Sequence, residues 1–181
     1  SIPEMTYFQT GNNNRDGFDS NLPSIMDFIL KDWLEMAFVE GESWDKGMIR
    51  FYNHFAQDLA LPNPQLIMNM LDNHDMARYR NAVKDDVKLI KMGMAMLATV
   101  RGYPQYYYGD EILIEGKGGS YEDARHCFPG GWAHHEVNAF DPKQRTKEQN
   151  EVYNYLRSLL QFRKTSEALC YGKMTHFLPH D

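Results

Sequence analysis

The sequence has few cysteines, no long apolar run and no excess of basic residues. Cys127 and Cys170 are its only cysteines, and neither belongs to a CxxC pair, so a zinc ribbon or a thioredoxin-like site is poorly supported. We expect two free, buried thiols, although a disulfide stays open because pairing in space is not visible in sequence. No apolar run approaches the roughly 20 residues of a membrane helix, and no basic, then apolar, signal-peptide pattern opens the chain. The 25 acidic residues outnumber the 19 basic ones, so nucleic acid is not an expected partner.

The chain is long and apolar enough for one globular domain. It has 181 residues, of which 43% are hydrophobic and 13% aromatic. Short apolar runs predict buried strands over residues 24–30, 65–71 and 104–108. After a loop over the first twenty residues, strand and helix patterns alternate along the chain. This alternation predicts an α/β fold with parallel strands and right-handed crossovers.

Apolar residues spaced three and four positions apart predict the helices between these strands. They fall at about 43–59, 87–97 and 146–162. Thr146 and Gln149 form a capping-box pair at the start of the last helix. The glycine-rich segment from 109 to about 142 is too long for an ordinary connection, so we expect it to carry functional residues.

Two polar clusters follow predicted strands, at the end where parallel α/β folds carry their chemistry. The first is Asn73, His74 and Asp75, with Arg78 just beyond it. The second is Gly-Asp-Glu at 109–111, whose carboxylates we interpret as structural groups that hold the loop. Asn-His-Asp alone is weak evidence, since these residue types are common in turns.

Four motifs in order resemble one enzyme family. The residues from Met70 to Arg78, MLDNHDMAR, are similar to the Asn-His-Asp signature of the α-amylase family, glycoside hydrolase family 13. Residues 17–20 and 26–28 resemble the sixth barrel strand of that family and its approach, and residues 102–112, GYPQYYYGDEI, resemble its eighth strand. Residues 123–132 resemble the Asp-x-Arg-x-x-Phe-Pro-Gly-Gly-Trp loop of its neopullulanase and cyclomaltodextrinase branch.

The resemblance implies a particular part of a barrel. We expect about three β/α units, strands six to eight, from the C-terminal part of a TIM (β/α)8 barrel. Residues 1–170 would form this partial catalytic barrel, and residues 171–181 would begin a truncated C-terminal β-domain. Since a closed barrel has no edges, either the remainder of the barrel or a second copy is expected to cover the exposed strand edges.

The resemblance also implies the chemistry. A retaining glycosidase needs a nucleophilic carboxylate and an acid/base carboxylate about 5 Å apart. In the family these are an Asp and a Glu upstream, so the fragment alone is expected to be inactive. Asp75 matches the third family carboxylate, which favours the oxocarbenium-like transition state. The structural alternative for Asp75 is a loop carboxylate that caps the turn.

Further residues are expected to bind the substrate, α-glucan oligosaccharides of the starch type. His74 and Asn73 belong to the signature; His74 would donate to a sugar hydroxyl, or it is a packed histidine. Arg78 would orient the carboxylate or meet a sugar, with a structural salt bridge as an equal alternative. Trp132 would stack on a pyranose face. Arg125 would contact substrate, with anchoring of its loop as the alternative.

Two alternatives to the enzyme hypothesis stay open. A non-catalytic carbohydrate-binding or partner-binding homologue of the same fold is the main rival, and an unrelated α/β domain is more distant. No metal site is expected here, because His126, Cys127, His134 and His135 have no recognised ligand spacing. Calcium is possible only elsewhere in the parent, which we expect to be periplasmic or secreted.

Overall fold

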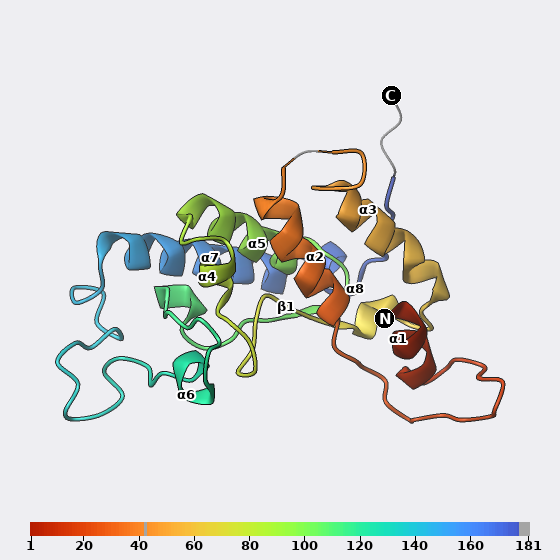
Figure 1. Cartoon of the computed structure of the whole chain (residues 1–181), viewed down its shortest axis with the longest axis horizontal. Helices are drawn as coiled ribbons and strands as arrows, with labels where there is room; N and C mark the ends of the chain where they lie inside the picture. Colours follow the sequence, from red (N-terminus) through yellow and green to blue (C-terminus); the bar gives the residue numbers. More distant parts are fainter. Residues whose placement is uncertain (42, 178–181) are drawn as a thin grey trace. The chain divides into compact units, whose positions relative to one another are not determined.

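The computed structural model describes residues 1–41 and 43–177 (Figure 1). The chain divides into two compact units, described separately below. The first unit comprises Ser1–Met70, Thr99–Gln105 and Ser166–Asp181, and the second comprises Leu71–Ala98 and Tyr106–Thr165. Elements of the first unit are α1 (Ile2–Phe8), α2 (Phe28–Val39), α3 (Ile49–Phe55), η1 (Ala56–Ala60), η2 (Pro64–Leu66), β1 (Met68–Met70), β2 (Tyr103–Gln105) and α8 (Glu167–Tyr171). Those of the second are α4 (Tyr79–Ala82), α5 (Val87–Thr99, whose last residue falls in the first unit), η3 (Asp110–Ile112), α6 (Tyr121–Ala124) and α7 (Lys147–Thr165).

The sheet of the first unit is parallel, as predicted. β1 pairs with β2 so that Met68 lies opposite Tyr103, and Met26 adds an isolated parallel bridge to Met68. Gly102, at φ +82°, permits this pairing, since a Cβ there would lie 2.2 Å from the Ile67 carbonyl oxygen. The strands are therefore correct in place and direction but shorter than the predicted runs 65–71 and 104–108.

The predicted strand at 24–30 is wrong beyond Met26. Asp27 caps α2 instead, accepting a hydrogen bond from the Leu30 amide at 2.9 Å. A capping carboxylate satisfies a free amide of the first helical turn, so the backbone turns helical at Phe28. The single charge that interrupts the apolar run thus marks the end of the extended backbone.

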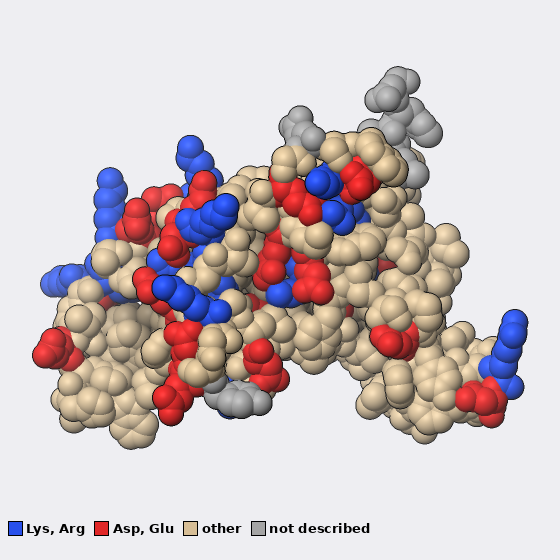
Figure 2. Space-filling view, in the orientation of Figure 1, with Lys and Arg blue, Asp and Glu red and all other residues tan. Residues whose placement is uncertain are grey.

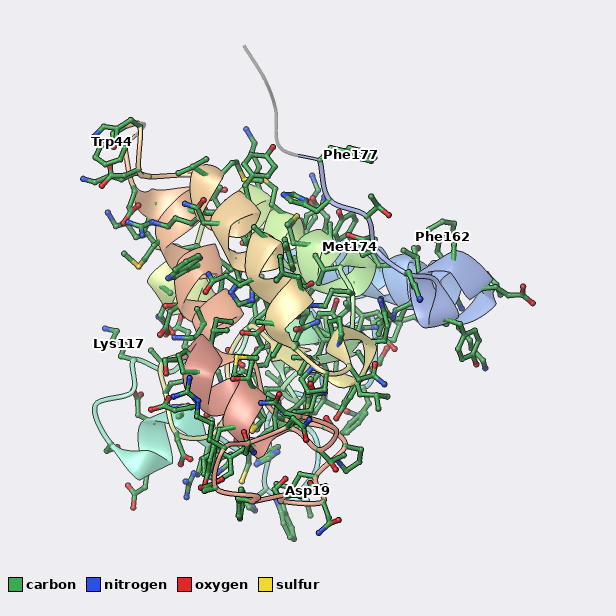
Figure 3. All side chains as sticks on the ribbon, turned by 90° about the vertical axis from the view of Figure 1, so that its right-hand side faces the viewer. Asp19, Trp44, Lys117, Phe162, Met174 and Phe177 are labelled. Atoms are coloured by element: carbon green, nitrogen blue, oxygen red, sulfur yellow. The ribbon has the colours of Figure 1, made fainter. Side chains whose placement is uncertain are left out.

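Two further expectations near the N-terminus are corrected. The first twenty residues are not all loop, because Ile2–Phe8 form α1 with Pro3 in the first turn, where proline is tolerated. The helix expected at 43–59 begins only at Ile49, since Gly47 takes a φ of +69° and breaks the helical path. Trp44, which precedes the helix, is 90% exposed and is labelled in Figure 3.

The long helices of the second unit agree with the sequence. The carboxylate of Asp86 accepts from the Lys88 amide at 2.8 Å at the start of α5. The capping box of α7 is confirmed by reciprocal bonds between Thr146 and Gln149, at 2.9 and 3.1 Å. Val152 and Leu156 are buried on the predicted stripe, whereas Phe162 is exposed.

In the described part of the chain, neither the C-terminal strand nor the burial of both cysteines is found as expected. Residues 172–177 form no strand, and 178–181 lie outside the described residues, so the division at residue 170 stays a prediction. Neither cysteine forms a disulfide, and Cys127 is exposed rather than buried, whereas Cys170 is half-buried. On the face shown in Figure 2, basic side chains lie beside acidic ones.

A buried polar network, which the sequence did not predict, holds the first unit together. The Arg101 guanidinium donates to Asp58 at 2.7 Å, to Asn69 at 3.0 Å and to Asp27 at 3.1 Å. His54 Nε2 lies 2.8 Å from the same Asp27 oxygen. Burial alone would raise the pKa of Asp27, but the hydrogen bond from His54 and the charges of His54 and Arg101 hold it below its ordinary value. This network explains the charged residue in the apolar run at 24–30.

Candidate active site

The Asn-His-Asp turn follows β1 in the chain and presents two of its side chains to solvent. Asn73 is buried, and its amide oxygen accepts from the backbone N–H of Asp75 at 2.8 Å. The side chains of His74 and Asp75 are 55% and 57% exposed. The hydrogen bond to Asn73 therefore restrains the backbone at Asp75, while the Asp75 carboxylate stays accessible.

Arg125 meets this turn from a loop fifty residues further along the chain. Its Nη2 lies 2.9 Å from Asp75 Oδ1, and its Nε donates to the His74 carbonyl oxygen at 3.1 Å. On the other side of the carboxylate, His74 Nε2 lies 3.3 Å from Asp75 Oδ2. The structure thus brings together three of the predicted site residues.

An open pocket adjoins these groups within the second unit. Its volume is about 500 Å³. The described residues that line it are His74, Asp75, Gly118, Gly119, Ser120 and Ala124. A carboxylate, an imidazole and small loop residues around such a space suit a polyhydroxylated ligand, because hydrogen bonds orient it while little side-chain bulk excludes it.

Trp132 lies on the same long segment and is 60% exposed, so its ring is available for stacking. It is not among the described residues that line the pocket beside Asp75. The turn that carries it depends on Gly130, at φ +98°, where a Cβ would lie 2.2 Å from Asn138 Oδ1. The structure confirms its accessibility, while its contact with a sugar stays a prediction.

Arg78 does not occupy the position expected of a substrate ligand. Its side chain is fully buried, with Nη1 2.8 Å from the Tyr108 carbonyl oxygen and 3.4 Å from Asp110 Oδ1. The guanidinium carbon also lies 4.0 Å from the centre of the Tyr107 ring. This geometry corresponds to the structural salt bridge, and burial leaves Arg78, like Asn73, without a surface to offer a sugar.

The sequence did not predict the buried carboxyl pair of Asp110 and Asp72. Burial, followed by the negative charge of Asp72, raises the pKa of Asp110 well above its ordinary value. Asp72 is also buried and accepts from the Tyr79 amide at 2.6 Å. Glu111 accepts from the Gly109 amide at 2.8 Å, which confirms its structural role. The signal in the sequence was that each of the two aspartates follows the apolar run of a predicted strand, at 65–71 and at 104–108.

The described residues show neither a metal centre nor a membrane helix. Among them, no three His, Cys, Asp or Glu side chains gather in a way that could hold a metal ion. Within the same described residues, no helix combines the length and apolar character needed to cross a bilayer.

Comparison with known proteins identifies the family. A family model described as "Alpha amylase, catalytic domain" matches residues 17–172. The chain belongs to the α-amylase family. The reading as an unrelated α/β domain is therefore excluded, and the family resemblance of the four motifs is confirmed.

The relatives of this α-amylase family chain are longer enzymes. An α-amylase of Niallia circulans is 27% identical over 169 residues, which cover 91% of this chain and 27% of the relative. A cyclomaltodextrinase of Geobacillus thermopakistaniensis is 29% identical over 113 residues, covering 62% of this chain and 17% of the relative. The chain thus spans less than a third of the length of these curated relatives.

Solved structures agree on the fold. The crystal structure of an α-amylase from Geobacillus thermoleovorans, complexed with acarbose, superposes with a TM-score of 0.64 at 21% identity. The match covers 84% of this chain and 31% of that one. The chain therefore has part of the barrel fold of α-amylase family enzymes.

Proposed function

We propose that this chain is the segment of a retaining α-glucan glycosidase that supplies the third catalytic carboxylate, Asp75. The observation that carries the proposal is an accessible carboxylate in the turn that follows β1 in the chain, beside an open pocket and between His74 and Arg125. Active sites of such folds lie at this end of the strands. The relatives named above, an α-amylase and a cyclomaltodextrinase, support an α-glucan as the substrate.

Each site residue has a distinct proposed role. Asp75 accepts hydrogen bonds from sugar hydroxyls, and these strengthen as the ring distorts and positive charge develops. His74 donates a hydrogen bond to a sugar hydroxyl, and Trp132 stacks on a pyranose face. Asn73 holds the backbone of the turn, and Arg78 holds the segment after β2 through Tyr108 and Asp110, so neither of these two buried side chains is proposed to touch the substrate.

The nucleophile and the acid/base are proposed to lie outside these residues. The three places of parallel strand pairing, Met26, β1 and β2, would then be strands six to eight of the barrel. The remaining units, or a second copy, would cover the exposed edges of these strands. Calcium, if the parent binds it, would lie in those other parts.

The Phe-Pro-Gly-Gly-Trp loop at 128–132 favours a neopullulanase-like or cyclomaltodextrinase-like specificity. A non-catalytic carbohydrate-binding homologue is the second candidate, since the same exposed groups would also bind a sugar without turnover. Cleavage and binding are separable by assay, so one experiment decides between the two.

The deciding experiment compares the 181-residue chain with the intact parent enzyme on maltooligosaccharides and cyclodextrins. We expect turnover by the parent with retained α-configuration, followed by proton NMR of the first product, and no turnover by the chain alone. Oligosaccharide binding by the parent without cleavage would support the non-catalytic homologue. Turnover by the isolated chain would show that the missing carboxylates lie within it.

A further inference from the structure

We propose that Arg125 is a positioning residue, which sets the orientation of the Asp75 carboxylate instead of contacting the sugar itself. This inference rests on the proposed function of Asp75. A guanidinium offers several N–H donors in a rigid plane, so two acceptors engaged at once fix both that plane and the acceptors. Here the two acceptors are the His74 carbonyl oxygen, at 3.1 Å, and Asp75 Oδ1, at 2.9 Å.

The two oxygens of the Asp75 carboxylate face different groups. Oδ1 is taken by Arg125, while Oδ2 lies on the side of the His74 ring, 3.3 Å from Nε2. An exposed carboxylate without such a partner rotates readily, because its terminal torsion has broad minima. With Oδ1 held, Oδ2 is left in one direction to receive a sugar hydroxyl.

The loop that carries Arg125 is fixed at its base by contacts that do not involve Arg125. The Gly116 carbonyl oxygen accepts from the Arg78 amide at 2.7 Å, and the Gly116 amide donates to Asn81 at 2.9 Å. Gly118, at φ +74°, packs so closely that a Cβ would lie 2.7 Å from the Ala77 nitrogen. The guanidinium therefore starts from a defined place, and its loss should leave the loop base intact.

A short helical turn, α6, delivers the side chain. Ser120 caps it by accepting from the Asp123 amide at 3.2 Å, and the Asp123 carboxylate accepts in turn from the Lys117 amide. Arg125 follows directly as the C-cap residue. Lys117, labelled in Figure 3, is an exposed cation on the same loop and supplies a matched control for loss of charge.

The kinetic arm of the test uses the parent enzyme. Since misplacement of a reacting group by about 1 Å can cost roughly a hundredfold in rate, Arg125→Ala should lower kcat about ten- to a hundredfold. KM should change by less than about threefold, because a contact that acts in the transition state leaves ground-state binding nearly unaltered. Arg125→Lys should recover part of kcat, while Lys117→Ala should leave both parameters unchanged. A raised KM with normal kcat for Arg125→Ala would make Arg125 a sugar ligand and overturn the proposal.

The second arm needs no activity and uses the 181-residue chain. Amide hydrogen exchange of residues 119–125 is compared for wild type, Arg125→Ala, Asp75→Asn and the double variant. If the two side chains hold each other, each single change accelerates exchange of the same amides, and the double change adds nothing further. Additive effects, or no effect of either change, would overturn the proposal. A parent that cleaves no α-glucan would refute the proposed function, whereas this exchange result would still decide whether Arg125 holds Asp75.

Discussion

Arg101 and Asp27 form an ion pair at 3.1 Å in which neither side chain reaches solvent. Arg101→Met removes the buried positive charge that faces Asp27 and leaves His54, at 2.8 Å, to hold this carboxylate. The loss of half of a buried ion pair should lower the free energy of unfolding by about 3–5 kcal/mol. The surface pair Lys91–Glu151, at 2.9 Å, is the control, and Lys91→Met should cost less than about 1 kcal/mol. Urea unfolding of the chain, followed by circular dichroism, measures both changes. Equal losses for the two variants would mean that the buried network adds nothing specific.

The catalytic prediction concerns Asp75 in the parent enzyme. Asp75→Asn keeps the shape of the side chain but removes its charge, and a charged hydrogen bond of this kind contributes about 3 kcal/mol or more to the transition state. Turnover should therefore fall at least roughly a hundredfold, while substrate affinity changes far less. His74→Ala should give a smaller loss, with a larger share in binding. Near-normal turnover by correctly folded Asp75→Asn enzyme would refute the role proposed for Asp75.

The buried carboxyl pair predicts a pH-dependent stability. The pKa of Asp110 is raised, mainly by burial and then by Asp72, so the folded state prefers the protonated form. Its stabilising contribution is fully present below the ordinary carboxyl pKa of 3.8 and is lost as pH rises through the raised value. Asp110→Asn cannot ionise, so its stability relative to wild type should improve as pH rises across this window.

Glu111→Gln is the matched control, because the neighbouring Glu111 carboxylate accepts from a backbone amide and is only half-buried. Unfolding free energies measured from pH 4 upward compare the three proteins. A constant difference between Asp110→Asn and wild type at every pH would show that Asp110 is ionised throughout.

Trp132 provides a test of binding against packing. Its ring is 60% exposed, so Trp132→Ala removes little buried surface and should leave thermal stability nearly unchanged. Loss of a stacking contact worth about 1.4 kcal/mol would weaken oligosaccharide affinity of the parent roughly tenfold. Calorimetric titration and thermal unfolding of the same samples separate the two effects. A large fall in stability with unchanged affinity would assign Trp132 to packing.

The sequence by itself determined the features that depend on neighbouring residues. The capping box at Thr146 and Gln149 and the stripe of α5 were readable because both arise within a few residues of each other. The parallel direction of β1 and β2 followed from the alternation of strands and helices. The Asn-His-Asp motif was visible because three adjacent residues carry it.

Only the tertiary structure decided which distant side chains meet. Asp27 is buried because Arg101 and His54, from other segments, satisfy it, and without them an apolar strand was the better local reading. Arg78 and Arg125 were both candidates for a sugar contact in sequence, yet Arg78 is buried against Tyr108 and Asp110 while Arg125 reaches Asp75. An arginine side chain is long enough to serve a core or a surface, so the packing around it determines its role.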